Sequence, residues 1–303
     1  MMNKLKSVMK SMRLRTLPLS LGGVVLGILL ATADYKVNPI AAFFILLTTV
    51  CLQILSNLSN ELGDVQSGTD TIDRQGPNYG LNSGELSIRE MKTAIWTFVV
   101  FCCLSGLAMI WTSFGSFLSV ESICLILLGA VAINASMRYT LGSRPYGYRG
   151  LGDMFVFIFF GLVSVLGAYF VAAHTIPSWF LVLPAASIGC FSVGVLNVNN
   201  MRDMKTDAAT RRTVALKLGL ANARIYQTVL ISLGWILMIL YCLFKIFDPW
   251  HYLFVLTLPF FVLHLRGVWT RKDGDLDPML PMLVMSSFVF ALLAGVGFLV
   301  YLF

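Results

Sequence analysis

Nine long apolar runs constrain this 303-residue chain more than any other feature of its sequence. Each run has roughly 17 to 25 residues, enough for a helix to cross the ~30 Å hydrocarbon core of a bilayer. The runs cover about residues 17–33, 39–59, 93–113, 117–136, 153–173, 178–199, 225–245, 250–266 and 279–302. Because backbone groups in lipid must hydrogen-bond within the chain, we expect an all-α membrane protein with about nine transmembrane helices.

The composition excludes a soluble protein, since 57% of the residues are hydrophobic and only 12% are charged. The formal net charge of +7 does not indicate a nucleic-acid partner, because the basic residues follow the loops. Of the 22 Lys and Arg residues, all but Lys36 and Lys245 lie at the N-terminus or in even-numbered loops. The positive-inside rule therefore predicts a cytoplasmic N-terminus in a multi-pass protein of the inner or plasma membrane.

The first run also imitates a signal peptide, with basic residues before it and Ala31-Thr32-Ala33 at its end. We favour a retained first helix, because eight further runs follow and residues 13–18 have the pattern of a structured helix start. The six Cys residues all lie inside apolar runs without metal-binding spacing, so we interpret them as small hydrophobic residues.

Two polar motifs follow the second and sixth runs, and both fall in loops assigned to the cytoplasmic side. The first, at residues 53–77, is QILSNLSNELGDVQSGTDTIDRQGP, and the second, at residues 197–213, is NVNNMRDMKTDAATRRT. At 100° per residue, the acids and amides of each motif form one helical stripe. The first stripe contains Asn57, Asn60, Glu61 and Asp64, and the second contains Asn199, Asp203 and Asp207.

Facing stripes of carboxylates would raise each other's pKa values unless a cation lay between them. Oxygen ligands without paired Cys or His favour a hard cation, and Mg²⁺ in particular when phosphates complete its shell. Arg202, Arg211 and Arg212 can bind the remaining phosphate oxygens. The motifs therefore predict a Mg²⁺–diphosphate site at the membrane surface, with an apolar chain extending into the bundle. Loss of diphosphate from an allylic chain would leave a carbocation, which aromatic residues can stabilise.

Three further features bear on the site. Asp153 lies at the start of an otherwise uncharged run, and an acid in that position is a functional candidate. Tyr146 and Tyr148 just before it are explained by an aromatic belt. Three acids, Asp273, Asp275 and Asp277, are expected to be solvated turn residues, although they could form a weak cation site.

The spacing of the motifs indicates an internal repeat. Asn60-x-x-x-Asp64 corresponds to Asn199-x-x-x-Asp203 about 140 residues later. We expect a single domain over residues 1–303 with parallel pseudo-repeat units around 13–92 and 153–224. The inverted repeats common in transporters would place the motifs on opposite sides of the membrane.

These motifs resemble the UbiA superfamily of intramembrane aromatic prenyltransferases. Its N-D-x-x-D pattern is matched by residues 60–64, NELGD, followed by Asp70, and its D-x-x-x-D pattern by residues 203–207, DMKTD. Glu61 stands where the superfamily usually has Asp, and residues 210–213, TRRT, replace the more usual G-K-x-T. The stretches GTDxxDRQGP, YGYRGLGDMFVFIFFG and NNMRDxxTDxxxxRRT resemble the branch that acts on 1,4-dihydroxy-2-naphthoate.

The resemblance implies about nine helices around a central cavity, Mg²⁺ and a polyprenyl diphosphate donor. It also implies an aromatic acid acceptor, dihydroxynaphthoate, whose carboxylate-bearing carbon attacks the allyl cation, so that CO₂ and diphosphate leave and demethylmenaquinone forms. The implied metal ligands are Asn60, Glu61, Asp64, Asn199, Asp203 and Asp207. The implied substrate-binding residues are Arg13, Asn57, Asp70, Arg74, Tyr139, Arg144, Arg202, Arg211 and Arg212. Among these, Tyr139 and Arg144 would close over the phosphate. Asp153 would orient the acceptor's hydroxyl groups or handle its proton.

Two alternatives remain at this point. Another acceptor of the same superfamily, such as 4-hydroxybenzoate, haem or homogentisate, would use the same metal site. A transporter would favour charges in mid-helix and broken helices near the bilayer midplane, whereas these carboxylates cluster at span ends on one face.

Overall fold

The computed structural model describes residues 2–69 and 77–300, with side chains from residue 4. Within that part of the chain, nine helical segments are long and apolar enough to cross a membrane, which confirms the predicted all-α fold. The helices are α1 (Met2–Ser11), α2 (Leu17–Asp34), α3 (Pro39–Gln66), α4 (Ile88–Phe114), α5 (Val120–Arg138), α6 (Gly152–Val156), α7 (Ala168–Ala173), α8 (Val182–Arg202), α9 (Met204–Asp207), α10 (Val214–Leu243), α11 (Leu258–Thr270) and α12 (Met279–Val300). A π-helical segment, Phe157–Gly167, joins α6 to α7 in one continuous span.

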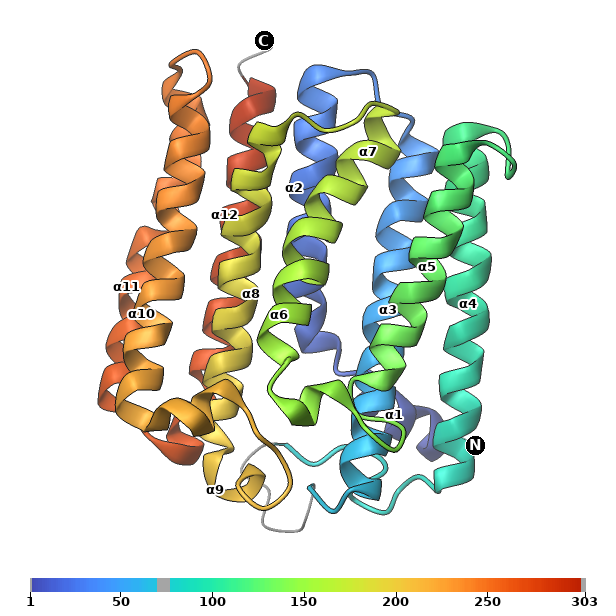
Figure 1. Ribbon diagram of the computed structural model, residues 1–303, viewed down its shortest axis with the longest axis vertical. Coiled ribbons are helices and arrows are strands. Elements are labelled where there is room, and N and C mark those ends of the chain that lie inside the picture. The colour runs from blue at the N-terminus through green and yellow to red at the C-terminus, as the bar shows by residue number, and fades with distance from the viewer. Residues whose placement is uncertain (1, 70–76, 301–303) are drawn as a thin grey trace.

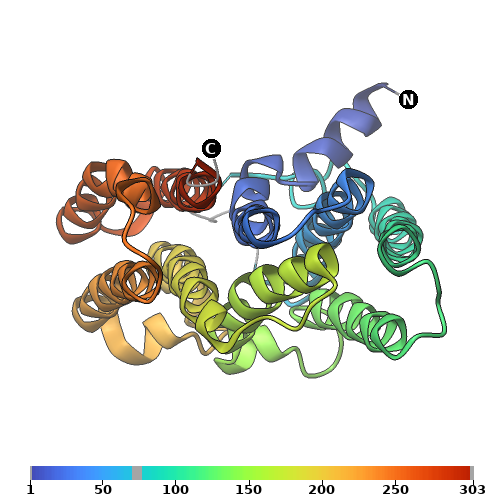
Figure 2. The ribbon, with the colours of Figure 1, turned by 90° about the horizontal axis from the view of Figure 1, so that it is seen from above.

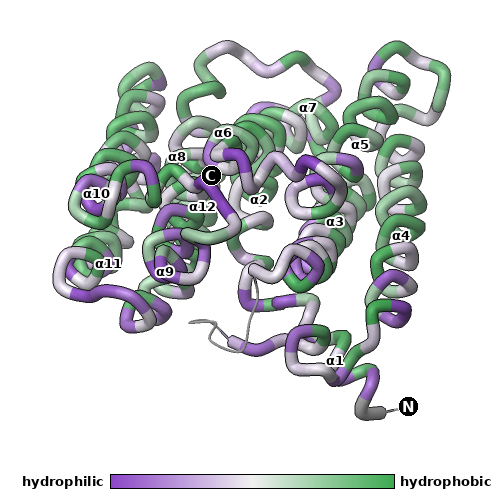
Figure 3. Tube along the Cα trace, turned by 60° about the horizontal axis from the view of Figure 1, so that its bottom comes forward, coloured by the Kyte–Doolittle hydropathy of each residue, from purple (hydrophilic) through white to green (hydrophobic). Residues whose placement is uncertain are grey.

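The long helices run side by side, and the short helices α1 and α9 both lie at the same end of the bundle (Figure 1). Seen along the bundle, α3 to α5 gather on one side and α8 with α10 to α12 on the other, with α2, α6 and α7 between them (Figure 2). Hydrophilic residues concentrate at the end that carries α1 and α9, whereas the long helices are mostly hydrophobic (Figure 3). The second motif includes α9, and its Arg211 pairs with Asp64 of the first motif, so both motifs lie at this end.

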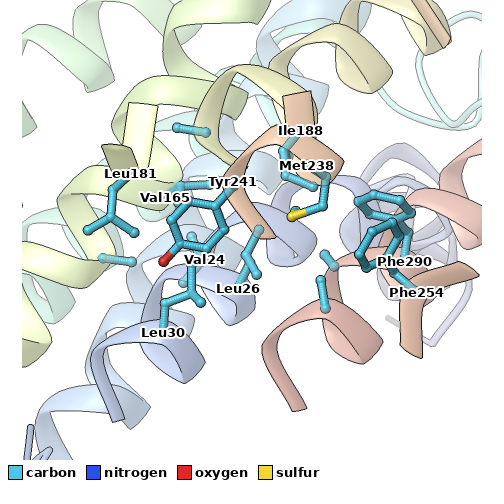
Figure 4. Packing of buried hydrophobic residues seen from close by; sticks show 14 of the residues in the cluster. Val24, Leu26, Leu30, Val165, Leu181, Ile188, Met238, Tyr241, Phe254 and Phe290 are labelled. Atoms are coloured by element: carbon cyan, nitrogen blue, oxygen red, sulfur yellow. The ribbon is translucent and has the colours of Figure 1, made fainter. Parts of the chain in front are cut away.

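The two largest hydrophobic clusters among the described residues pack the long helices against one another. The larger one packs α2 and the π-helical segment against α8, α10 and α12, and includes Ile188, Met238 and Phe290 (Figure 4). The smaller one packs α3 against α4 and includes Leu55, Leu58 and Met91. Burying large aromatic and aliphatic side chains in this way fixes the helices that carry the motifs.

Close helix contacts bring the two sides together around the middle of the bundle. A Cβ atom on Gly161 would lie 2.6 Å from the Cα atom of Gly189, so the π-helical segment can approach α8 only because both positions lack a side chain. Gly27 of α2 faces the backbone of Val165 in the same way. Small residues thus let the π-helical segment pack closely against both α2 and α8.

Candidate active site

A cavity of about 440 Å³ lies inside the bundle and receives residues from both motifs. Apolar and aromatic side chains of α5, α6 and the π-helical segment form much of its wall, among them Leu125, Leu128, Phe155, Phe159 and Val163. Its polar lining includes Arg13, Asn57, Asn60, Asp64, Tyr139, Asn199, Arg202, Asp203, Asp207 and Arg211. Most of the site residues expected from the sequence therefore share one cavity.

Arg211 links the two motifs directly. Its guanidinium forms an ion pair with Asp64 of α3, and its Nε atom lies 3.6 Å from Oδ1 of Asp207 in α9. Burial alone would lower the pKa of Arg211, but the charges of Asp64 and Asp207 outweigh that effect and raise this pKa above its ordinary value. A permanently charged guanidinium between two carboxylates removes the repulsion that the facing stripes would otherwise have.

Tyr148 completes the surroundings of Asp64. Its hydroxyl donates to Oδ1 of Asp64 at 2.7 Å, and the Arg211 guanidinium lies over its ring at 4.7 Å from Cζ to the ring centre. Burial, followed by the charge of Asp64, raises the pKa of Tyr148 to about 12, so the phenol stays a proton donor. The sequence interpretation missed this residue by assigning it to an aromatic belt, although its place in the loop next to Arg149 was a signal.

In the second motif, Arg202 holds Asp203 and Asn199 at the end of its own helix. It is 2% exposed and donates from Nε and Nη2 to the two oxygens of Asp203 at 2.8 and 2.7 Å. Nη2 also donates to Oδ1 of Asn199 at 3.0 Å, and Nη1 donates to Asp277 at 2.6 Å. Such bidentate pairing fixes the direction of both oxygens of Asp203.

Asp277 corrects a sequence expectation. It was predicted to be a solvated turn residue, but it accepts a hydrogen bond from the buried Arg202. Asp273 pairs with Lys205 at 2.7 Å, on a more exposed surface. The sequence alone could not show this, because the contact joins two segments 75 residues apart in the chain.

Asn57 and Arg13 belong to a second group of contacts, at the start of α2. The side-chain amide of Asn57 donates to the carbonyl of Met12 at 2.8 Å and to the Thr16 hydroxyl at 3.0 Å. Arg13, between these two residues, has a left-handed backbone with φ of 50°. Its guanidinium Cζ atom lies 4.2 Å from the centre of the Tyr79 ring. Asn57 therefore ties down the segment that presents Arg13 to the cavity.

Four expected site residues do not line the cavity. The carboxylate of Glu61 accepts from the backbone amides of Leu81 and Asn82 instead. Asp153 faces α10, where it accepts from the Tyr226 hydroxyl at 3.0 Å, so the expectation that it orients the acceptor is not supported. Arg144 and Arg212 are exposed outside the cavity lining, and Arg212 contributes a backbone bond to Tyr148. Asp70 and Arg74 lie outside the described residues.

The donor set suits a cation that is completed by phosphate. Within the described residues, no three His, Cys, Asp or Glu side chains form a cluster that could hold a metal by themselves. The cavity instead receives single carboxylates from separate helix ends, with the amides of Asn60 and Asn199 beside them. Mg²⁺ is typically bound by one or two carboxylates together with substrate phosphates, which fits this arrangement.

These features define a multi-pass membrane protein whose apolar internal cavity ends in a cluster of carboxylates and arginines. Residues 20–288 match the UbiA prenyltransferase family, and the chain belongs to that family. The resemblance seen in its motifs is thereby confirmed.

Relatives cover nearly the whole chain. The chain is 38% identical over 292 residues to the 1,4-dihydroxy-2-naphthoate octaprenyltransferase of Escherichia coli (strain K12), covering 95% of this chain and 94% of that protein. It is 36% identical over 304 residues to the protein of the same name from Haemophilus influenzae (strain ATCC 51907 / DSM 11121 / KW20 / Rd), covering 98% and 97%. The fold resembles that of a UbiA homologue from Archaeoglobus fulgidus bound to GPP and Mg²⁺, with a TM-score of 0.67 at 13% identity over 96% of this chain and 99% of that chain.

Proposed function

We propose that this protein transfers a polyprenyl chain from polyprenyl diphosphate to 1,4-dihydroxy-2-naphthoate, with release of diphosphate and CO₂. The observation that carries the proposal is that the acids of both motifs meet at the polar end of one apolar cavity. The polar end of such a cavity suits a diphosphate, and its apolar part suits a polyprenyl chain. The acceptor is supported by the names of the near-full-length relatives.

The donor's diphosphate binds at the polar end of the cavity. Asp64, Asp203 and Asp207, with Asn60 and Asn199, would hold Mg²⁺, which when bound makes diphosphate a better leaving group. Arg13, Arg202 and Arg211 then bind phosphate oxygens and stabilise the negative charge that develops on the diphosphate as the C–O bond breaks. Arg202 and Arg211 already pair with Asp203 and Asp64, so a bound phosphate would share each arginine with its carboxylate partner.

The apolar part of the cavity protects the allyl cation. Phe155, Phe159 and Phe160 line it, and aromatic faces stabilise a nearby cation while excluding water. The acceptor carbon that bears the carboxylate attacks the allylic carbon, and a new C–C bond forms. The bond to the carboxylate then breaks, and its electron pair returns to the ring. The products are CO₂ and the quinol form of demethylmenaquinone, so CO₂ replaces the proton that a base would otherwise remove.

The charge distribution supports a cytoplasmic site. The end that carries α1 and α9 contains the basic loops and both motifs, and the positive-inside rule assigns that end to the cytoplasm. An inner or plasma membrane location would give the site direct access to water-soluble naphthoate and to membrane-dissolved donor.

An acceptor competition tests the proposal. Purified protein would receive a long-chain polyprenyl diphosphate, Mg²⁺ and carboxyl-labelled 1,4-dihydroxy-2-naphthoate or 4-hydroxybenzoate, with lipid product and CO₂ both quantified. We expect prenylated naphthoquinol with an equal amount of CO₂, abolished by EDTA. Product from 4-hydroxybenzoate without CO₂ would contradict the acceptor. Donor flux into liposomes without any chemical turnover would contradict the enzymatic function.

A further inference from the structure

Glu61 occupies an acidic position of the first motif but faces away from the cavity. Its side chain is fully buried, and its Oε1 atom accepts from the Leu81 amide at 2.6 Å and the Asn82 amide at 3.3 Å. At 100° per residue, Glu61 lies roughly 65° from the middle of the stripe formed by Asn57, Asn60 and Asp64. That offset directs its carboxylate to the turn at residues 79–82 instead of the cavity.

This turn carries a residue of the active site. Tyr79 lines the cavity, and its ring faces the guanidinium of Arg13 at 4.2 Å from Cζ to the ring centre. The Tyr79 hydroxyl accepts from Nη2 of Arg15 at 3.1 Å. The position of the turn therefore sets the position of the aromatic face on which Arg13 rests.

The opposite side of the turn is held by α1. The amide of Gly80 donates to the Ser11 hydroxyl at 3.1 Å, and a Cβ atom on Gly80 would lie 2.6 Å from the carbonyl oxygen of Ser7. Glu85, just after the turn, accepts from Ser7 at 2.6 Å and from Lys10 at 2.7 Å. The turn is thus fixed between α1 and the Glu61 carboxylate of α3.

We propose that Glu61 is a positioning residue, which holds the turn at residues 79–82 and through Tyr79 places Arg13 for the donor's diphosphate. The proposal rests on the proposed function, and it replaces the expectation that Glu61 binds the metal. A carboxylate that accepts two backbone amides forms charge-assisted hydrogen bonds, which are stronger than neutral ones. The longer side chain of Glu, compared with the Asp usual in the family, is what reaches the Leu81 amide.

A metal-binding role and a positioning role for Glu61 predict opposite orders of activity for two conservative variants. Glu61→Gln keeps the length and a carbonyl oxygen that can accept both amides, and Oε2 has no hydrogen-bond partner within the described residues to lose. Glu61→Asp keeps the charge but is shorter by one methylene and loses the amide contacts. A metal ligand would tolerate Asp and be impaired by Gln, whereas a positioning residue would tolerate Gln and be impaired by Asp.

The kinetic test measures the KM for polyprenyl diphosphate, kcat and the Mg²⁺ concentration for half-maximal rate in both variants. We expect Glu61→Gln to stay within about threefold of the unmodified protein, and Glu61→Asp to raise the donor KM about tenfold or more with an unchanged Mg²⁺ requirement. Near-normal kinetics for Glu61→Asp would overturn the proposal. So would a raised Mg²⁺ requirement in Glu61→Gln.

Two further measurements keep the test decisive if Glu61→Asp fails to fold. Tyr79→Leu removes the ring under Arg13 without touching Glu61, and we expect a similar rise in donor KM. Against an Arg13→Ala background, Tyr79→Leu should add little, since residues that act through one another are not additive. Full additivity in that cycle, or a normal KM in Tyr79→Leu, would contradict the proposal.

Substrate-free proteolysis separates this inference from the proposed function. Cleavage within residues 77–87 should be faster in Glu61→Asp than in Glu61→Gln, whatever the acceptor is. Equal cleavage rates would contradict the role of Glu61. Absence of naphthoate turnover in the unmodified protein would instead contradict the proposed function, while the proteolysis comparison would still report on Glu61.

Discussion

The two motifs place their acids by different means. Asp203 is held by Arg202, its immediate neighbour in the chain, through two hydrogen bonds. Asp64 is instead held by Tyr148 and Arg211, which lie 84 and 147 residues away. The second motif is therefore largely assembled by one helix end, whereas the first is assembled by contacts between distant loops.

The difference teaches where the site is sensitive. Local pairing is formed whenever α8 is formed, but long-range pairing requires the loops around residues 139–148 and 205–213 to dock as well. A hydrogen bond between the hydroxyls of Thr69 and Thr210, at 2.9 Å, connects these regions further. We expect distant substitutions to disturb Asp64 more than Asp203.

The largest effect should come from the acids themselves. Asp64→Asn and Asp203→Asn each remove a charge from the proposed diphosphate site, and we expect each to lower kcat about 10²- to 10³-fold. The loss of kcat in the double variant should be much smaller than the product of the two single losses, because both acids act on one site. Steady-state rates at saturating donor measure this. Multiplicative losses would mean that the motifs work independently.

A smaller effect is expected at Asp277. Asp277→Asn removes the charge of the carboxylate that holds Arg202 from the side away from Asp203. Residues that orient the groups of a site in this way typically contribute about tenfold to activity. The matched control is Asp273→Asn, because Asp273 pairs with the exposed Lys205 and such surface pairs contribute little. We expect less than about twofold from the control. Equal losses in the two variants would show that the second motif does not depend on this contact.

Tyr148 tests how far the first motif depends on a distant contact, because its hydroxyl donates to Asp64. We expect Tyr148→Phe to cost about three- to tenfold in kcat/KM, since it removes one hydrogen bond to Asp64. The pKa of Tyr148 is raised to about 12, so the phenol keeps its proton from pH 6 to 9. The ratio of unmodified to variant rates should therefore stay constant from pH 6 to 9. A ratio that falls within this range would contradict the assigned donor role.

The smallest effect concerns α1. The hydrogen bonds from Lys10 and then Ser7 hold the pKa of Glu85 below its usual value, so this acid contributes to docking above its unfolded pKa. That contribution is lost as the pH falls through the lowered pKa of the folded state. The hydrogen-exchange protection factors of residues 4–11 should therefore fall only in acid, below the ordinary carboxyl range. Glu85→Gln should remove this pH dependence, and its persistence in that variant would assign it to another group.

The sequence predicted the fold, and it predicted that most of the candidate residues lie close together, for clear physical reasons. Nine apolar runs fix nine spans, and helical periodicity places Asn60 with Asp64 and Asn199 with Asp203. It failed where contacts cross long sequence distances, as at Asp277 and Tyr148. The sequence also failed to place Glu61. The helical stripe that it shares with Asn57, Asn60 and Asp64 is about 100° wide, and the pattern does not show which edge of the stripe faces the cavity and which faces a loop.

The most direct test of the central claim, that both motifs form one cation–diphosphate site, is Mn²⁺ binding followed by electron paramagnetic resonance. The protein in nanodiscs would be titrated with Mn²⁺ with and without a non-hydrolysable prenyl diphosphate analogue, alongside Asp64→Asn and Asp203→Asn. We expect a diphosphate-dependent population of bound Mn²⁺ that each single variant abolishes. Retention of half of that population in each variant would show two separate sites and contradict the account.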